Sequence, residues 1–262
     1  MDLGIAGKAA LVTASSRGLG FEAAKSLAEE GAKVAICARH KKGIEEARDQ
    51  LKQSGADILA LTCDVTDESE VERMVRTVNE KFGAIDILVA NCGGPPPGPF
   101  LQHTAEDWRK AVELNLMSTV FLCRQVIPGM TERRWGRIVL MTSITAKQPI
   151  EGLVLSNSVR AAVVGLGKSL AGELGPYNIL VNSVCPGYFL TERVRGLAES
   201  SSCLSGESPQ AFIDSWAQQG VLGRIGNPAE FGPLVAFLCS EKASYITGAA
   251  VAIDGGLNRS IF

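Results

Sequence analysis

The chain has 262 residues, of which 46% are apolar and 21% are charged, and its formal net charge at pH 7 is -2. This size and composition suit one globular domain, and a charge so close to zero gives no electrostatic reason to expect nucleic acid or an anionic membrane as a partner. The first residues lack a basic region followed by an apolar segment, and no apolar run is long enough to span a bilayer. We therefore expect a small-molecule partner, with neither an export signal nor a membrane anchor.

Short β-branched apolar runs alternate with longer segments of helical period, which predicts βαβ units and a parallel sheet covered on both faces. The predicted strands are 9–13, 34–38, 58–63, 85–90, 137–142, 179–184 and 249–253. We expect one α/β domain over residues 1–262, with a Rossmann-type, doubly wound parallel sheet of seven strands and helices on both faces.

Helical patterns separate these strands. A polar-faced helix is predicted over 43–54, and Asp67 precedes an acidic first turn, which makes it a plausible N-cap. Longer helices are predicted over 105–130 and 153–175, and they leave faces for a partner subunit. A homo-oligomer, either a dimer or a tetramer, is therefore our hypothesis.

Seven cysteines are scattered along the chain without a C-x-x-C pair, and several fall inside apolar strand-like runs. Buried, reduced thiols explain this pattern best, so we expect a cytoplasmic protein with no metal site.

Two segments interrupt the alternation of strands and helices. Residues 93–99 are rich in glycine and proline and cannot be helical, and residues 192–220 are polar, serine-rich and poorly patterned. Both follow predicted strands. Because ligands of open parallel sheets lie beyond the carboxyl ends of the strands, we expect 192–220 to be a mobile substrate lid.

A glycine-rich loop, Thr13-Ala14-Ser15-Ser16-Arg17-Gly18-Leu19-Gly20, follows the first strand and opens a helix. In this context the glycines would let the backbone approach a pyrophosphate, and the helix N-terminus would offer free N–H groups to it. The alternative is a plain tight turn. The surrounding βαβ series favours the dinucleotide site.

The end of the second strand indicates which dinucleotide is bound. An acidic residue there would accept a hydrogen bond from a ribose 2′-hydroxyl, but the sequence is Cys37-Ala38-Arg39-His40-Lys41-Lys42. Arg39, and Arg17 in the glycine-rich loop, could instead bind a 2′-phosphate, which favours NADP(H) over NAD(H). The alternative is that this basic run is a solvated helix start.

At this point several motifs resemble, in the right order, those of the short-chain dehydrogenase/reductase family, and in particular its 3-oxoacyl-carrier-protein reductase-like branch. The loop at 13–20 resembles the family's T-G-x-x-x-G-x-G, with Ala14 in place of the first glycine. The resemblance also covers the adenine-contacting pair at 64–65, the N-N-A-G element at 91–94, the P-G-x-x-x-T segment at 186–191 and the last strand with its turn at 246–256. Together with the charge argument for Arg17 and Arg39, it implies a cofactor site formed by Thr13, Ser15, Ser16, Arg17, Gly18, Leu19, Gly20, Arg39, Asp64, Val65, Asn91, Gly93, Arg160, Pro186, Gly187 and Thr191.

The catalytic group departs from the family pattern. Asn115 and Ser143 match the family's Asn and Ser, but its Y-x-x-x-K aligns with Ser156 and Arg160. A serine hydroxyl is a far weaker acid than a phenol, and a guanidinium keeps the positive charge of lysine but cannot relay a proton. The expected catalytic residues are Asn115, Ser143, Ser156 and Arg160.

Two functions therefore stand. The first is an NADP(H)-dependent oxidoreductase acting on a carbonyl or alcohol, and the second is a nucleotide-binding sensor or scaffold with little or no turnover. Retention of Asn115, Ser143 and the 186–187 segment favours the enzyme. In the enzyme the proton would come from water held by Ser143, Ser156 and Asn115, or from Lys147 or His103.

Several of these side chains have alternative structural roles. Ser156 and Asn157 could equally be capping residues near a helix start, and Lys147 and His103 could be solvated surface side chains. Residues 95–100 and 153–155 offer apolar walls, and Arg193, Arg195 and Arg224 could meet an anion. Neither set of residues identifies the substrate.

Overall fold

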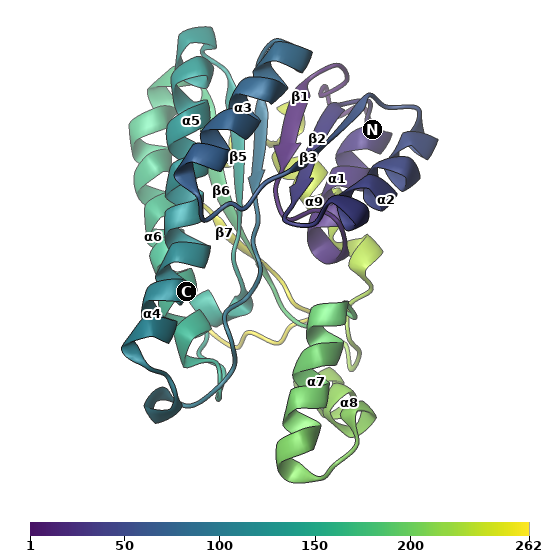
Figure 1. Cartoon of the computed structure of the whole chain (residues 1–262), viewed down its shortest axis with the longest axis vertical. Coiled ribbons are helices and arrows are strands. Elements are labelled where there is room, and N and C mark those ends of the chain that lie inside the picture. The colour runs from purple at the N-terminus through teal and green to yellow at the C-terminus, as the bar shows by residue number, and fades with distance from the viewer. Residues whose placement is uncertain (262) are drawn as a thin grey trace.

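The computed structural model describes residues 1–261, with the side chains of all of these except 204 and 205. Seven strands form one sheet in the order β3-β2-β1-β4-β5-β6-β7, and every neighbouring pair is parallel (Figure 1). The strands are β1 (Ala9–Val12), β2 (Lys33–Ala38), β3 (Ile58–Thr62), β4 (Ile87–Ala90), β5 (Gly136–Met141), β6 (Ile179–Pro186) and β7 (Ala250–Ile253). The predicted doubly wound sheet is confirmed.

Helices cover both faces of this sheet. Buried residues of α1 (Gly18–Glu29), α2 (Lys41–Leu51) and α9 (Gly232–Leu238) pack on one face. Buried residues of α3 (Glu68–Phe82), α5 (Ser118–Arg133) and α6 (Val154–Leu174) pack on the other. Asp67 caps α3 as predicted, because its side chain accepts hydrogen bonds from the backbone N–H groups of Ser69 and Glu70.

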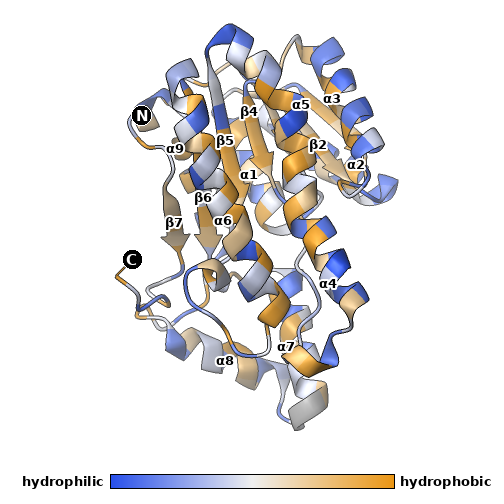
Figure 2. Cartoon of the chain, turned by 90° about the vertical axis from the view of Figure 1, so that its left-hand side faces the viewer, coloured by the Kyte–Doolittle hydropathy of each residue, from blue (hydrophilic) through white to orange (hydrophobic). Residues whose placement is uncertain are grey.

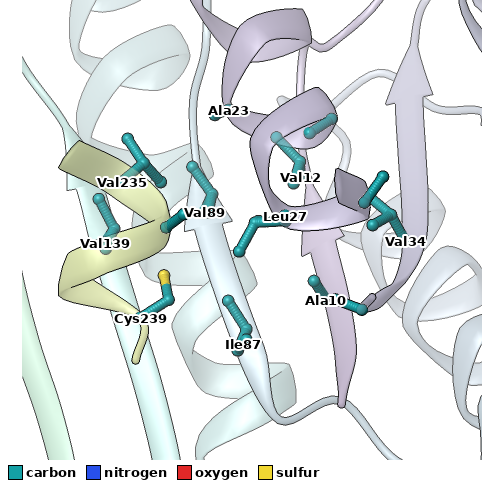
Figure 3. Close-up of a cluster of buried hydrophobic side chains, with 14 of the residues drawn as sticks. Ala10, Val12, Ala23, Leu27, Val34, Ile87, Val89, Val139, Val235 and Cys239 are labelled. Carbon is teal, nitrogen blue, oxygen red and sulfur yellow. The ribbon is translucent and has the colours of Figure 1, made fainter. Parts of the chain in front are cut away.

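The two cores follow from the period of two along each strand. Val12, Val34 and Val89 point to the face with α1, where Leu27 and Val235 meet them (Figure 3), whereas Leu11 and Leu88 point to the opposite core. Figure 2 shows the central strands β4 and β5 in orange, between helices that carry both blue and orange residues. Strands buried on both faces explain the continuous apolar runs of the sequence. Among the described residues, none of the helices is both long and apolar enough to cross a membrane.

The helix predicted over 105–130 is interrupted. The chain forms α4 (Ala105–Val112), a π-helical turn at Glu113–Met117 and then α5. The side chains of Ser118 and Thr119 bond back to the carbonyl groups of Leu114 and Asn115 in this turn. Periodicity alone does not reveal such a turn, and it is here that Asn115 lies.

The predicted lid segment forms two helices, α7 (Glu192–Ser205) and α8 (Pro209–Gln219), which project beyond the sheet (Figure 1). Both start with side-chain caps, Thr191 and Ser208. Its serine-rich composition concealed this helical structure. That the segment moves stays a prediction.

All seven cysteines are free, and five of them are buried as predicted: Cys37, Cys63, Cys123, Cys185 and Cys239. Cys92 is half-buried and Cys203 is exposed, which departs from the prediction. Burial raises the pKa of the Cys123 and Cys239 thiols to about 12, so these two stay protonated and act as packing groups.

Ala14 takes a backbone conformation that favours glycine, with φ of 47°. A residue with a Cβ loses roughly 1–2 kcal/mol in the left-handed region, whereas glycine costs roughly 0.5–1 kcal/mol in chain entropy. We expect Ala14→Gly to raise the free energy of unfolding by about 0.5–1 kcal/mol, measured by urea denaturation. The control Ala162→Gly, at an exposed position within α6, should lower it by about 1 kcal/mol. Equal losses in the two variants would contradict strain at Ala14.

Candidate active site

A cleft of about 730 Å³ lies beyond the carboxyl ends of the strands. It is lined by residues within segments 14–20, 38–40, 63–65, 91–94, 141–145, 150–160 and 186–197, so each of strands β1 to β6 leads into it. Most of the predicted site residues are brought together here. Thr13, Ser15 and Asn115 are fully buried and lie behind the lining.

The glycine-rich loop is tied to the end of β4. The Thr13 hydroxyl donates to the carbonyl of Asn91 (2.6 Å) and accepts from its N–H (2.8 Å), while the Asn91 amide donates to the Ala14 carbonyl (3.1 Å). A Cβ added to Gly20 would lie 2.6 Å from both the Ala14 carbonyl oxygen and the Asn91 amide nitrogen. Only glycine permits this approach.

The neighbouring residues leave the start of α1 open. The Ser15 hydroxyl donates to the Val12 carbonyl (2.7 Å) and accepts from the Cys37 N–H (3.3 Å), so it braces the loop against β2. No side chain among the described residues caps the N-terminus of α1, and its first turn holds no acid. Its free N–H groups, together with Ser16, Gly18 and Leu19 in the lining, suit a phosphate.

The far end of the cleft holds Arg39, Asp64 and Val65. Asp64 accepts hydrogen bonds from the N–H (3.0 Å) and hydroxyl (2.8 Å) of Thr66. Arg39 is exposed and forms no ion pair with any residue that the structure describes. Arg17, which the sequence placed beside it as a phosphate ligand, instead pairs with Glu192 in the first turn of α7.

Asn115 and Arg160 meet at the floor of the cleft, on the carbonyl of Gly93. The Asn115 amide donates to this carbonyl (2.8 Å) and to the Cys92 sulfur (3.0 Å), and the Arg160 guanidinium donates to it (3.2 Å) and to the Met141 carbonyl (2.9 Å). The Asn115 side chain is fully buried and Arg160 is 6% exposed. Asn115 Oδ1 and Arg160 Nε are buried without a partner among the described atoms.

Three hydroxyl groups line the wall above this pair. The Ser156 hydroxyl shares a hydrogen bond with that of Thr145 (3.0 Å), and the Ser143 hydroxyl accepts from the Thr145 N–H (3.2 Å). Ser156 does not cap α6, whose N-cap is Leu153. Asn157 holds the backbone of Ile150 through both atoms of its amide (3.0 and 3.1 Å).

The opposite wall comes from the end of β6 and the segment that follows it. Pro186, Gly187 and Thr191 all line the cleft, and a Cβ on Gly187 would lie 2.7 Å from the Asp254 side chain. Tyr188 stacks on Trp216 of α8 with ring centroids 4.9 Å apart, and burial raises the pKa of its phenol.

Among the lining residues that were given no definite role from the sequence are Cys92, Thr145 and Arg193. Of the other arginines considered for an anion, Arg195 lies outside the lining and Arg224 makes a bidentate pair with Glu230 (2.7 and 2.8 Å). This pair lowers the pKa of Glu230 to about 2.

The two loop candidates for proton donation, Lys147 and His103, are also absent from the described lining. His103 lies 3.2 Å from the Gly98 carbonyl.

Comparison with known proteins identifies the family. The family model described as enoyl-(acyl carrier protein) reductase matches residues 13–258. Dehydrogenase/reductase SDR family member 4 of Oryctolagus cuniculus is 36% identical over 253 residues, which are 96% of this chain and 94% of that protein. L-sorbose reductase from Gluconobacter frateurii, solved with NADPH and L-sorbose, superposes with a TM-score of 0.94 at 35% identity and covers 100% of both chains. A variant of actinorhodin polyketide ketoreductase with NADPH gives a TM-score of 0.93 at 34% identity, covering 97% of this chain and 98% of that one. The chain therefore belongs to the short-chain dehydrogenase/reductase family of oxidoreductases.

Proposed function

We propose that this chain is an NADP(H)-dependent carbonyl reductase or alcohol dehydrogenase that works with an altered catalytic group, Asn115, Ser143, Ser156 and Arg160. The observation that carries the proposal is the meeting of Asn115 and Arg160 on the Gly93 carbonyl, where each keeps a buried polar atom without a partner. Leaving such atoms unpaired costs about 1–3 kcal/mol, and Arg160 is part of the cleft lining, which supports a polar ligand or a bound water molecule beside this pair.

The residues present fit a nicotinamide dinucleotide. The open N-terminus of α1 and the close approach at Gly20 suit its pyrophosphate, and Arg160 suits the hydroxyl groups of the nicotinamide ribose. The chemistry that NADP(H) supplies when bound is transfer of a hydride to or from the carbon of a carbonyl or alcohol. Two of the solved relatives are NADPH complexes, which supports the choice of cofactor class.

The chain's own residues position the substrate oxygen and supply its proton. Ser143 and Ser156 present hydroxyl groups to the cleft, and Thr145 fixes the Ser156 hydroxyl by a hydrogen bond. A serine hydroxyl is too weak an acid to act alone, so we assign the proton to a water molecule that these hydroxyls orient. A guanidinium has donors only and cannot relay a proton, so Arg160 binds and orients. Turnover should therefore be slow compared with an enzyme that uses a phenol.

The preference for NADP(H) rests on Arg39, which is exposed at the adenine end of the cleft. A charge-assisted hydrogen bond contributes about 1.5–3 kcal/mol, so we expect Arg39→Asp to shift the ratio of NADPH to NADH affinity about 10- to 100-fold toward NADH, measured by calorimetry. Lys42→Asp is the control, because it changes the charge equally but Lys42 lies outside the described lining. An equal shift in both variants would contradict a specific phosphate contact.

The function itself is tested with purified protein and a panel of ketones and aldehydes, following NADPH absorbance. Turnover of any of them supports the reductase. Measurable NADPH affinity with no turnover would favour a binding protein instead.

We also propose that the chain works in the cytoplasm as a homo-oligomer, a dimer or a tetramer. Exposed residues of α4 and α5, such as Lys110 and Arg124, leave a face of these helices open, which supports packing against a second subunit.

A further inference from the structure

Two arginines, Arg160 and Arg193, bring positive charge to the substrate half of the cleft, and neither forms an ion pair with a residue that the structure describes. Among the described residues that line it between 141 and 197, the other charged side chain is Glu192, which is paired with Arg17. The remaining acid of the lining, Asp64, lies at the end of β3 and is bonded to Thr66. The substrate half therefore carries uncompensated positive charge.

Arg193 is held in place across the mouth of the cleft. It lies in the first turn of α7, and its guanidinium donates to the Pro95 carbonyl on the facing loop (2.7 Å). A Cβ on Gly94 would lie 3.1–3.3 Å from three atoms of Arg193, so the side chain lies against this glycine. Its Nη1 and Nε atoms bond to no other residue that the structure describes. Only one of the two N–H groups of Nη2 is used by Pro95, so the other can still form a two-donor fork with Nε or with Nη1, on the edge of the guanidinium that Pro95 leaves free.

The two guanidinium groups act on one another. Burial, together with repulsion by Arg160, lowers the pKa of Arg193. Arg160 is 6% exposed, it bonds only to carbonyl groups and the Cys92 sulfur, and its Nε has no partner. A buried cation without a counter-ion is unfavourable. A bound anion would supply the counter-charge and would offset the repulsion between the two guanidinium groups. The two guanidinium groups are therefore arranged to bind an anion.

The surroundings of Arg193 define the rest of the ligand. Ile150, Leu153, Val194 and Leu197 line the same half of the cleft, beside the hydroxyl groups of Ser143 and Ser156. The site thus offers an apolar wall, hydroxyl groups for a carbonyl oxygen and a cationic fork for a carboxylate.

We propose that the substrates are oxo acids and the corresponding hydroxy acids, whose carboxylate binds the guanidinium of Arg193. This inference rests on the proposed function, because it names the substrate class of the same site. The two phosphates at the centre of the cofactor are a second source of negative charge, so the test must separate substrate from cofactor.

The experiment compares 2-, 3- and 4-oxopentanoate with their methyl esters, which keep the ketone but lose the charge. We expect kcat/KM with at least one acid to exceed that with its ester about 10-fold or more, and Arg193→Gln to lower this ratio about 10- to 100-fold. Arg193→Lys should retain part of the ratio, since it keeps the charge but loses the fork. Arg195→Gln, two residues along the helix and outside the described lining, should retain all of it.

Calorimetry provides a readout that does not need turnover. We expect the protein–NADP⁺ complex to bind the hydroxy acids but not their methyl esters, and Arg193→Gln to lose this difference while its NADPH affinity changes less than about 3-fold. If the unmodified protein shows equal affinity and equal kcat/KM for the acids and their esters, the proposal is overturned. So does an Arg193→Gln variant that loses NADPH and every substrate alike, because the arginine would then serve the cofactor. Absence of turnover with acid-selective binding intact would contradict the reductase and leave the carboxylate site standing.

Discussion

We expect the double substitution Ser156→Tyr with Arg160→Lys to raise kcat/KM for carbonyl reduction at least about 100-fold. General acid catalysis contributes 10²–10⁴-fold, and the two changes add a phenol that is a far stronger acid than a serine hydroxyl. Ser156 is half-buried and lines the cleft, so a longer side chain at this position can extend into open space. The ammonium group introduced at position 160 would lower the pKa of the phenol.

The matched control for this gain is Ser156→Phe with Arg160→Lys. It introduces a ring of nearly the same size without the hydroxyl, so it should give none of the increase. The measurement is initial rates of NADPH oxidation with each variant at saturating cofactor. If the tyrosine variant instead abolishes an existing activity, the serine and arginine support a chemistry of their own.

Much of the fold could be predicted because the central strands β1, β4 and β5 are buried on both faces. The runs around Leu11 and Leu88 are apolar throughout, and such runs fit only the interior of a parallel sheet between two layers of helices. The predicted strand ends differ from the structure by at most two residues, as at β4, which begins at Ile87 rather than at residue 85. Here local pattern and long-range packing impose the same structure.

The features that could not be predicted depend on residues far apart in the chain. The bond from Arg193 to Pro95 joins residues 98 positions apart, and no local pattern contains it. The pair of Arg17 with Glu192 likewise spans 175 positions, so the sequence placed Arg17 beside Arg39 on charge alone. Segment 192–220 was difficult for a different reason: serine is common in loops, but the caps Thr191 and Ser208 allow two helices to start there.

The resemblance brought most of the site together, yet it did not show how the site is supported. Thr13 and Ser15 belong to the family's loop motif, but their side chains hold the backbone of Asn91 and Val12 from behind the lining. Asn115 also lies behind the lining, where the π-helical turn directs its amide to the Gly93 carbonyl. Whether these three residues also contact a cofactor stays a prediction.

We expect Gly20→Ala to weaken NADPH binding about 10-fold or more and to lower the free energy of unfolding by about 1–3 kcal/mol. The added methyl would lie 2.6 Å from the Ala14 carbonyl oxygen, which is backbone, and equally close to the Asn91 amide. Neither group can move alone, since the Asn91 backbone is bonded to Thr13 and its amide to Ala14. Relief of the clash must therefore shift the loop on which the proposed pyrophosphate site is built.

Gly165→Ala separates this effect from the general effect of glycine in a helix. Gly165 is exposed on α6, and apart from the backbone of its own helix a Cβ there would meet nothing within 4 Å, so alanine should be neutral or stabilising by roughly 0.5–1 kcal/mol. Urea denaturation and NADPH calorimetry on both variants give the comparison. If Gly20→Ala loses stability but binds NADPH as tightly as the unmodified protein, the dinucleotide does not depend on the amides of this loop. The pyrophosphate site proposed at the start of α1, and with it the cofactor site of the proposed reductase, would then be wrong.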